Sequence, residues 1–293
     1  MAFSVMDIVK LNYINQYDGG NMEDKLLNLI AACLVFVGGQ AIAKSPSVDD
    51  IVHHANKVSY YAGQDGRAQV EMTITDNQNR VRNRRMTILR KDVPETDALE
   101  KGAYRGKQKF YVYFTRPADV NKMAFLVWKE LDTDDERWLY LPALDLVKRI
   151  AASDKRTSFV GSDFYYEDVS GRDIDEDKHE LIETTDNYYV LKNTPIDRSS
   201  VEFDHYKMYI HKDSFIPVQV EYYDAQGSKY RVATAVKVDI IQGHATVTKA
   251  SMENLKTGSK TVMEYSDVKY DIGLPDDIFS ERYLRKPPRK FLR

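Results

Sequence analysis

Ser162 and Asp163 are the pair of side chains in this 293-residue sequence that comes nearest to a catalytic pattern. They stand in an aromatic segment, where a serine beside a carboxylate suggests a hydrolase. A serine nucleophile needs a base within hydrogen-bonding reach, most often a histidine. No histidine lies near this pair in the sequence, so a turn or a helix cap is the simpler interpretation.

The histidines and acidic residues do not form a recognisable metal site. His53 and His54 are adjacent on a predicted helix and therefore diverge, while His205 and His211 lie far apart along one predicted strand. The acidic run between the two tryptophans suits a solvated turn better than a calcium site: Asp132, Asp134, Asp135 and Glu136. The sequence contains no nucleotide-binding loop, zinc-protease helix or EF-hand loop. We therefore predict no catalytic residue, no metal and no cofactor, and a protein that is not an enzyme.

The charge balance argues against general nucleic-acid binding. The 42 lysines and arginines against 45 aspartates and glutamates give a net charge of −3, whereas nucleic acid attracts a basic surface. Hydrophobic residues make up 43% of the chain, which is enough for a sizeable buried core. The single cysteine, Cys33, excludes a disulfide framework.

Five arginines lie close together in one predicted hairpin: Arg80, Arg82, Arg84, Arg85 and Arg90. A strand face in contact with water explains them simply. The alternative is a docking surface for anionic lipid headgroups or for a partner protein.

The first 43 residues resemble an export signal rather than part of the fold. From Met22, a short polar start precedes an apolar run over 26–37 and the small residues Ala41-Ile42-Ala43, which is the three-part arrangement of a secretory signal peptide. We predict an upstream extension over 1–21, a signal peptide over 22–43 with cleavage after Ala43, and one domain over 44–293. In the less favoured alternative, residues 30–33 form a lipobox and Cys33 carries a lipid anchor.

Hydrophobic periodicity predicts one helix followed by strands. Ser47 can cap a helix whose apolar residues recur every three or four positions from Val48 to Val58. After Gly63 the apolar residues alternate with polar ones, which is typical of strands with one buried face. The clearest runs lie in the last third of the chain, over 206–210, 216–222, 230–236, 244–254 and 260–270.

Short turns between these runs predict roughly eleven strands in meander order, in one large curved antiparallel sheet of the mainly β (α+β) class. The segment 145–177 departs from the alternation and is predicted to be a long connection that acts as a lid or partner site. The concave face of a curled sheet must be filled, capped by helices or left as a cavity for an apolar guest. The 20 Tyr, 11 Phe and 2 Trp suit a cavity lining and a packed core equally well.

Three stretches carry a family resemblance. They are Trp138-Leu139-Tyr140-Leu141-Pro142-Ala143 with Gly161-Ser162-Asp163-Phe164, and the later Leu274-Pro275-Asp276-Asp277-Ile278-Phe279-Ser280. Over nearly all of 44–293 the sequence resembles the outer membrane lipoprotein-sorting proteins, relatives of the LolA and LolB carriers. The resemblance implies a periplasmic protein with an unclosed β-barrel, whose concave face holds acyl chains beneath helical lids. It also implies an association with inner-membrane exporters of the RND (MMPL-like) type.

Together these observations predict a periplasmic carrier. Its cargo is a lipid or the acyl chains of a lipoprotein, which it shuttles toward the outer membrane with an RND-type exporter and only transient membrane contact. The predicted cavity residues are Val70, Met72, Ile74, Phe125, Trp128, Trp138, Tyr140, Met208, Val218, Val220, Tyr230 and Val232. The predicted lid and docking residues are Phe159, Phe164, Tyr165 and Tyr166. The alternatives are a scaffold subunit of an envelope transporter with a filled core, and an enzyme with Ser162 or a carboxylate pair at the base of a tight pocket.

Overall fold

An antiparallel sheet of thirteen strands dominates the part of the chain that the computed structural model describes, residues 45–93, 106–131 and 133–293. The predicted extension, signal peptide and cleavage site, Cys33 and Asp132 lie outside the described residues. The strands are β1 (Asp65–Thr75), β2 (Val81–Asp92), β3 (Gln108–Arg116), β4 (Ala124–Lys129), β5 (Glu136–Leu141), β6 (Leu146–Ile150), β7 (Asp177–Thr184), β8 (Tyr188–Pro195), β9 (His205–His211), β10 (Pro217–Tyr223), β11 (Lys229–Ile241), β12 (His244–Asn254) and β13 (Ser259–Tyr270).

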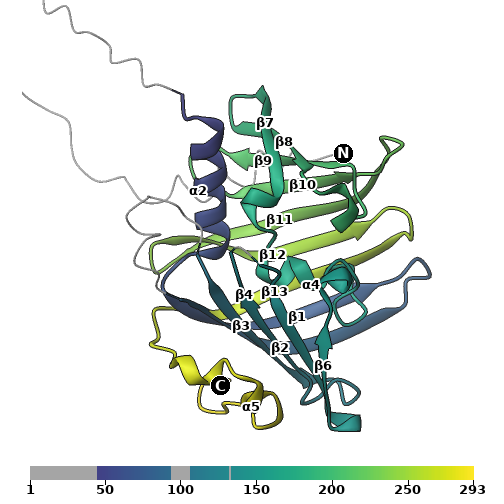
Figure 1. Cartoon of the computed structure of the whole chain (residues 1–293), viewed down its shortest axis with the longest axis vertical. Helices are drawn as coiled ribbons and strands as arrows, with labels where there is room; N and C mark the ends of the chain where they lie inside the picture. The colour runs from purple at the N-terminus through teal and green to yellow at the C-terminus, as the bar shows by residue number, and fades with distance from the viewer. Residues whose placement is uncertain (1–44, 94–105, 132) are drawn as a thin grey trace, which may run out of the picture. The chain divides into compact units, whose positions relative to one another are not determined.

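The sheet consists of two meanders joined at its centre. Its order is β6-β5-β4-β3-β2-β1-β13-β12-β11-β10-β9-β8-β7, and the strand direction rotates from one end to the other (Figure 1). The first meander runs outward from β1 to one edge, and the second returns from the opposite edge to pair β13 with β1. Because β6 and β7 each pair on one side only within the described residues, the sheet is unclosed. The predicted fold class is therefore confirmed, with two meanders in place of one.

The prediction of an irregular connection over 145–177 is wrong at its start. Residues 146–150 form β6, which pairs with β5, and the connection covers only 151–176. The strand was missed because it is short and lies at an edge, where only Ile150 is buried while Leu146, Lys148 and Arg149 are exposed. Charged side chains are common on edge strands because they oppose pairing with another chain.

Both faces of the first meander are covered, and β4 shows this most clearly. Phe125 and Val127 contact the connection 151–176 on what we call the inner face. Ala124, Leu126 and Trp128 point to the outer face, where they meet the C-terminal segment 274–293. This segment contains the 3-10 turn η5 (Asp276–Ile278) and the helix α5 (Glu281–Arg285). The apolar run of β4 therefore reflects burial on both sides.

Two helical segments cover the inner face. The helix α2 (Val48–Tyr60) begins with the predicted capping box between Ser47 and Asp50, and its residues Ile51, Val52 and Ala55 pack against β8 and β9. The connection 151–176 carries the helix α4 (Tyr166–Ser170) between the 3-10 turns η2 (Ala152–Asp154) and η3 (Ile174–Glu176). Figure 1 shows both helices beside the sheet. None of the described helices is long and apolar enough to cross a membrane.

Candidate functional site: a cavity on the inner face of the sheet

A cavity of about 470 Å³ lies between α2, the connection 151–176 and the inner face of the sheet. Its volume is within the usual range of small-molecule sites, roughly 300–1,000 Å³. Most of its lining is apolar: Val52, Ala55 and Val58 on α2; Ala68, Ile88 and Phe110 on β1–β3; Leu191, Met208 and Val220 on β8–β10; and Ala233, Ala235, Ala250, Met252, Tyr265 and Val268 on β11–β13.

Small side chains at inward positions of the central strands leave this space open. Ala233 on β11 is paired with Met252 on β12, and Ala235 is paired with Ala250. These alanines lie on the face of the sheet that α2 and the connection cover, yet each is only half-buried. A methyl group reaches too short a distance to fill the gap beneath a helix, so the space beside these residues stays unoccupied by protein atoms.

Arg90 fixes the end of α2 over the cavity. Its guanidinium donates hydrogen bonds to the carbonyls of Tyr60, Ala62 and Gly63 at 2.6–2.8 Å, and the side-chain amide of Gln108 donates to the Tyr60 carbonyl at 2.8 Å. Cations and donors at a helix C-terminus satisfy carbonyls that have no partner within the helix. The helix is thereby tied to β2 and β3 at the point where it reaches the cavity.

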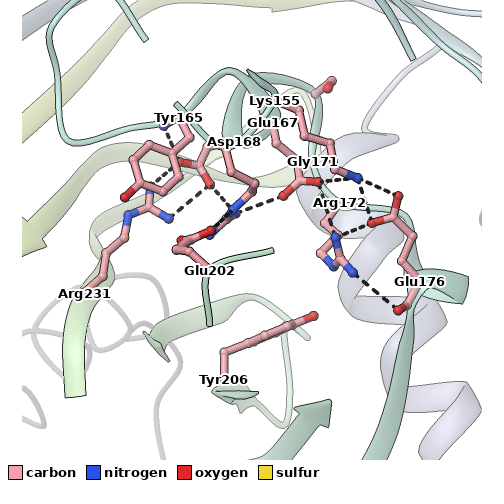
Figure 2. A network of polar contacts seen from close by, with 12 residues as sticks. Lys155, Tyr165, Glu167, Asp168, Gly171, Arg172, Glu176, Glu202, Tyr206 and Arg231 are labelled. Carbon is pink, nitrogen blue, oxygen red and sulfur yellow. Dashed lines mark hydrogen bonds and ion pairs between the residues drawn. The ribbon is translucent and has the colours of Figure 1, made fainter. Parts of the chain in front are cut away.

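Charged residues of the connection form one wall of the cavity, and Figure 2 shows the polar contacts between them. Glu167 on α4 lies at its centre and accepts contacts from Lys155 at 3.2 Å, Arg156 at 2.9 Å and Arg172 at 3.4 Å. Although burial acts to raise the pKa of Glu167, the three cations together lower it to about 2. The carboxylate therefore remains charged and holds the segment together.

The same wall is anchored to the sheet through Arg231 of β11, whose side chain is fully buried. Arg231 forms an ion pair with Asp168 and donates to the backbone carbonyl of Asp163 at 3.0 Å. Although burial acts to lower the pKa of Arg231, the Asp168 carboxylate raises it. The guanidinium also lies over the ring of Tyr165 at 4.0 Å, which adds a cation–π contact.

The five arginines of the β1–β2 hairpin do not share one solvent-facing patch. Arg90 lies inside, against α2, and Arg84 is buried and donates to the carbonyl of Val160. Arg82 donates to the carbonyl of Gly161, while Arg80 and Arg85 form ion pairs with Asp76 and Glu71. The explanation by water contact alone is wrong for Arg84 and Arg90, which hold covering segments onto the sheet.

Nine of the twelve predicted cavity residues fall into three groups. Met208 and Val220 line the cavity. Val70, Met72, Ile74 and Phe125 lie on the inner face in the buried cluster beneath the connection. Trp128, Trp138 and Tyr140 belong to the outer cluster that contacts the C-terminal segment.

The other three predicted cavity residues lie on β10 and β11. Tyr230 packs against Phe203 and Tyr206 and donates to Glu202 at 2.7 Å. Val232 is paired with Glu253, and Val218 stands at an irregularity in the pairing of β9 with β10. Neither valine is part of the cavity lining.

The predicted lid residues lie together on the connection. The rings of Phe159 and Tyr166 pack against Phe125 at 5.3 and 5.2 Å. Phe164 lines the cavity, and Tyr165 lies beside Arg231. The connection therefore packs on the inner face of the first meander and borders the hollow, which residues of both meanders line.

Ser162 and Asp163 hold the connection in place. The Ser162 hydroxyl donates to the carbonyl of Phe159 at 2.7 Å, and the Asp163 carboxylate accepts from Thr261 on β13 at 2.7 Å. Among the described residues no histidine forms a hydrogen bond with this pair, so the turn interpretation fits its contacts. The described residues contain no group of three or more histidine, cysteine or carboxylate side chains that could hold a metal ion.

Sequence reasoning missed the charged wall and the inward alanines Ala233, Ala235 and Ala250, which we call the alanine floor of the cavity. Arg231 and Ala233 stand between Tyr230, Val232 and Thr234, and an arginine among apolar residues in a strand is the signal that could have indicated a buried ion pair. Simple alternation failed here because the pairing of β10 with β11 is irregular between Tyr222 and Tyr223, which changes the face that the following residues occupy.

Comparison with known proteins agrees with this arrangement. A family model described as an uncharacterized protein matches residues 106–286. The crystal structure of a DUF1329 family protein from Desulfovibrio piger is 30% identical, with a TM-score of 0.72 over 81% of this chain and 97% of that chain. None of the curated proteins matches the chain.

Two further crystal structures share the fold. A domain from Vibrio parahaemolyticus, described as outer membrane lipoprotein-sorting, is 27% identical, with a TM-score of 0.70 over 80% of this chain and 97% of that chain. A LolA superfamily protein from Nitrosomonas europaea is 23% identical, with a TM-score of 0.62 over 82% of this chain and 100% of that chain. The predicted resemblance to lipoprotein-sorting proteins is thus confirmed, and the chain belongs to the DUF1329 family.

Proposed function

We propose that this protein is a periplasmic carrier that binds a lipid, or the acyl chains of a lipoprotein, in the cavity beneath α2. The observation that carries the proposal is the cavity of about 470 Å³ with its alanine floor. Removing apolar surface from water contributes roughly 25 cal/mol per Å², so an acyl chain gains affinity from burial alone. The relative from Vibrio parahaemolyticus that is described as lipoprotein-sorting supports the same class of cargo.

A cargo larger than this cavity would need the connection 151–176 to move. The predicted residues Val70, Met72, Ile74 and Phe125 lie directly beneath it, and we include them in the proposed binding surface for that state. Release would follow when an acceptor binds the cargo more tightly or favours the open arrangement. Export by the segment 22–43, delivery toward the outer membrane and loading by an RND-type exporter belong to the same proposal.

Lipid extraction tests the carrier directly. The chain is exported in a bacterial host, purified from the periplasm without detergent and extracted with organic solvent for mass spectrometry. We expect about one lipid per protein. Consistent absence of lipid, together with no uptake of a fluorescent fatty acid, would overturn the proposal and favour a scaffold subunit that carries no cargo.

A matched pair of variants separates cavity binding from surface adsorption. Ala250→Phe places a ring in the hollow, whereas Ala225→Phe makes the same change in the exposed turn between β10 and β11. We expect Ala250→Phe to lower the bound lipid severalfold and Ala225→Phe to leave it unchanged. Equal lipid on both variants would contradict binding in this cavity.

A further inference from the structure

Three tyrosines from three different elements line the cavity next to its charged wall. Tyr60 is the last residue of α2, Tyr222 lies on β10 and Tyr265 lies on β13. The hydroxyls of Tyr60 and Tyr222 form no hydrogen bond within the described residues, and that of Tyr265 meets only the sulfur of Met263 at 3.4 Å. By contrast, the nearby Tyr206 donates to Asp177 at 2.8 Å.

The phenol oxygens of Tyr60 and Tyr222 are not sealed by protein atoms. Within the described chain, three side-chain nitrogen or oxygen atoms are fully buried and have no hydrogen-bond partner: Arg67 Nε, Gln108 Oε1 and Arg137 Nε. Since neither phenol is among them and both residues line the cavity, each hydroxyl keeps accessible surface. A donor in this position binds water while the cavity is empty and needs an acceptor when an apolar chain displaces that water.

Both rings are held rigidly, so the two hydroxyls are preorganised. The Tyr60 ring lies against the backbone of Gly171, where an added Cβ would be 2.4 Å from Cζ. The Tyr222 ring lies between Arg156 and Arg231, whose guanidinium carbons are 5.4 and 5.1 Å from its centre. Fixed donors lose little conformational freedom when a ligand binds.

The surroundings favour a neutral acceptor over an anion. Burial raises the pKa of Tyr60, Tyr222 and Tyr265, so all three remain O–H donors. The pKa of Tyr60 is raised further by Asp168 and by the phenols of Tyr222 and Tyr265, which line the same cavity. The two nearby arginines are already paired with carboxylates.

We infer that the cavity binds a cargo bearing a neutral acyl carbonyl, an ester or amide, which accepts hydrogen bonds from Tyr60 and Tyr222 while its alkyl chain lies along the alanine floor. This inference rests on the proposed carrier function and narrows its cargo to acylated lipids rather than plain hydrocarbons or free fatty acids.

Competition binding tests the inferred recognition of an acyl carbonyl, with probes that share one alkyl chain length. A fluorescent ester is bound first and then displaced by methyl palmitate, palmitic acid or hexadecane. The displacement is measured on the purified full chain, on Tyr60→Phe, on Tyr222→Phe and on the control Tyr113→Phe. Tyr113 lies on the outer face and its phenol also has no hydrogen-bond partner in the described residues. Each cavity variant is expected to weaken ester binding about five- to tenfold, to leave hexadecane binding unchanged, and to differ from the control.

The outcomes separate this inference from the carrier proposal. If hexadecane binds and the ester binds no better, or if both tyrosine variants weaken ester and alkane equally, the inference is overturned and the carrier stands. If palmitic acid binds more tightly than its ester at neutral pH, the neutral acceptor is overturned. Binding of none of the three would overturn the carrier as well. Repeating the series with a monoacylglycerol and a lysophospholipid identifies which ester source loses affinity in the variants.

Discussion

Gly171 shows how a single residue shapes the wall of the cavity. It ends α4 with a φ of +77° and touches the ring of Tyr60. Gly227, in the turn between β10 and β11, has nearly the same φ of +76° but has no atom within 4 Å of an added Cβ. Gly171 differs from Gly227 in its contact with Tyr60, and its ψ of 150° also places it in a backbone region that almost only glycine adopts.

Substitution of both glycines tests this difference. Gly227→Ala should cost about 1 kcal/mol of unfolding free energy, from left-handed backbone strain alone. Gly171→Ala should cost a further 1–3 kcal/mol or so, because its Cβ must displace the Tyr60 ring and its backbone conformation is unfavourable for alanine. Urea denaturation of both variants measures the two costs. Equal losses would contradict the close contact.

Arg231 is the second residue whose removal should have a large effect. Arg231→Leu leaves the largely buried Asp168 carboxylate without its nearer cation, and Arg156 lies only at 3.9 Å, so the change should cost about 3–5 kcal/mol. Adding Asp168→Asn should recover part of that loss, because the uncompensated charge is then gone. Denaturation of the single and double variants measures the coupling. A loss below about 1 kcal/mol in the single variant would mean that the pair does not hold the connection.

At the scale of elements, the connection 151–176 depends on charge. Glu167 has an ordinary pKa of 4.5 when unfolded and about 2 when folded. Between these values the unfolded chain takes up a proton that the folded chain does not, so stability falls as the pH falls. The contribution is roughly 3 kcal/mol, fully present above pH 4.5 and lost as the pH approaches 2.

Acid titration of unfolding measures this contribution. The difference in unfolding free energy between the native chain and Glu167→Gln should shrink as the pH falls from 4.5 to 2 and stay constant above that range. A difference that remains constant across the whole range would show that Glu167 does not titrate in this way.

The elements were predictable where local signals determine them. The capping pair Ser47 and Asp50 fixes the start of α2, and the alternation of Val70, Met72 and Ile74 fixes the inner face of β1. The edge strand β6 could not be predicted, because its alternation covers only five residues. The wall of the cavity depends on ion pairs between β11 and α4, which no local pattern contains.

At the scale of the molecule, the outer face of the first meander is sealed by the chain's own C-terminus. Phe279 is buried there and its carbonyl accepts a hydrogen bond from the Trp128 indole at 2.8 Å. Trp128 and Trp138, the two tryptophans of the sequence, both belong to this cluster. The sequence alone did not decide whether the aromatic residues line a cavity or pack in a core. They do both, on different faces of one sheet.

Intrinsic tryptophan fluorescence distinguishes the apolar cluster on the inner face of the first meander from the one on its outer face. Phe279→Ala and Phe159→Ala each remove a fully buried ring and should each cost about 3–5 kcal/mol. Only Phe279→Ala should shift the tryptophan emission of the folded protein to longer wavelength, since Phe159 lies on the inner face. A comparable shift in both variants would mean that the layers are not separate.

The pairing of β1 with β13 has a consequence for biogenesis. Met72 is paired with Met263, so the middle of the sheet joins strands from opposite ends of the described chain. Contacts this distant in sequence form slowly, and during synthesis the backbone edge of β1 stays exposed until the final strand has emerged. A stalled or shortened polypeptide would present that edge as a template for aggregation.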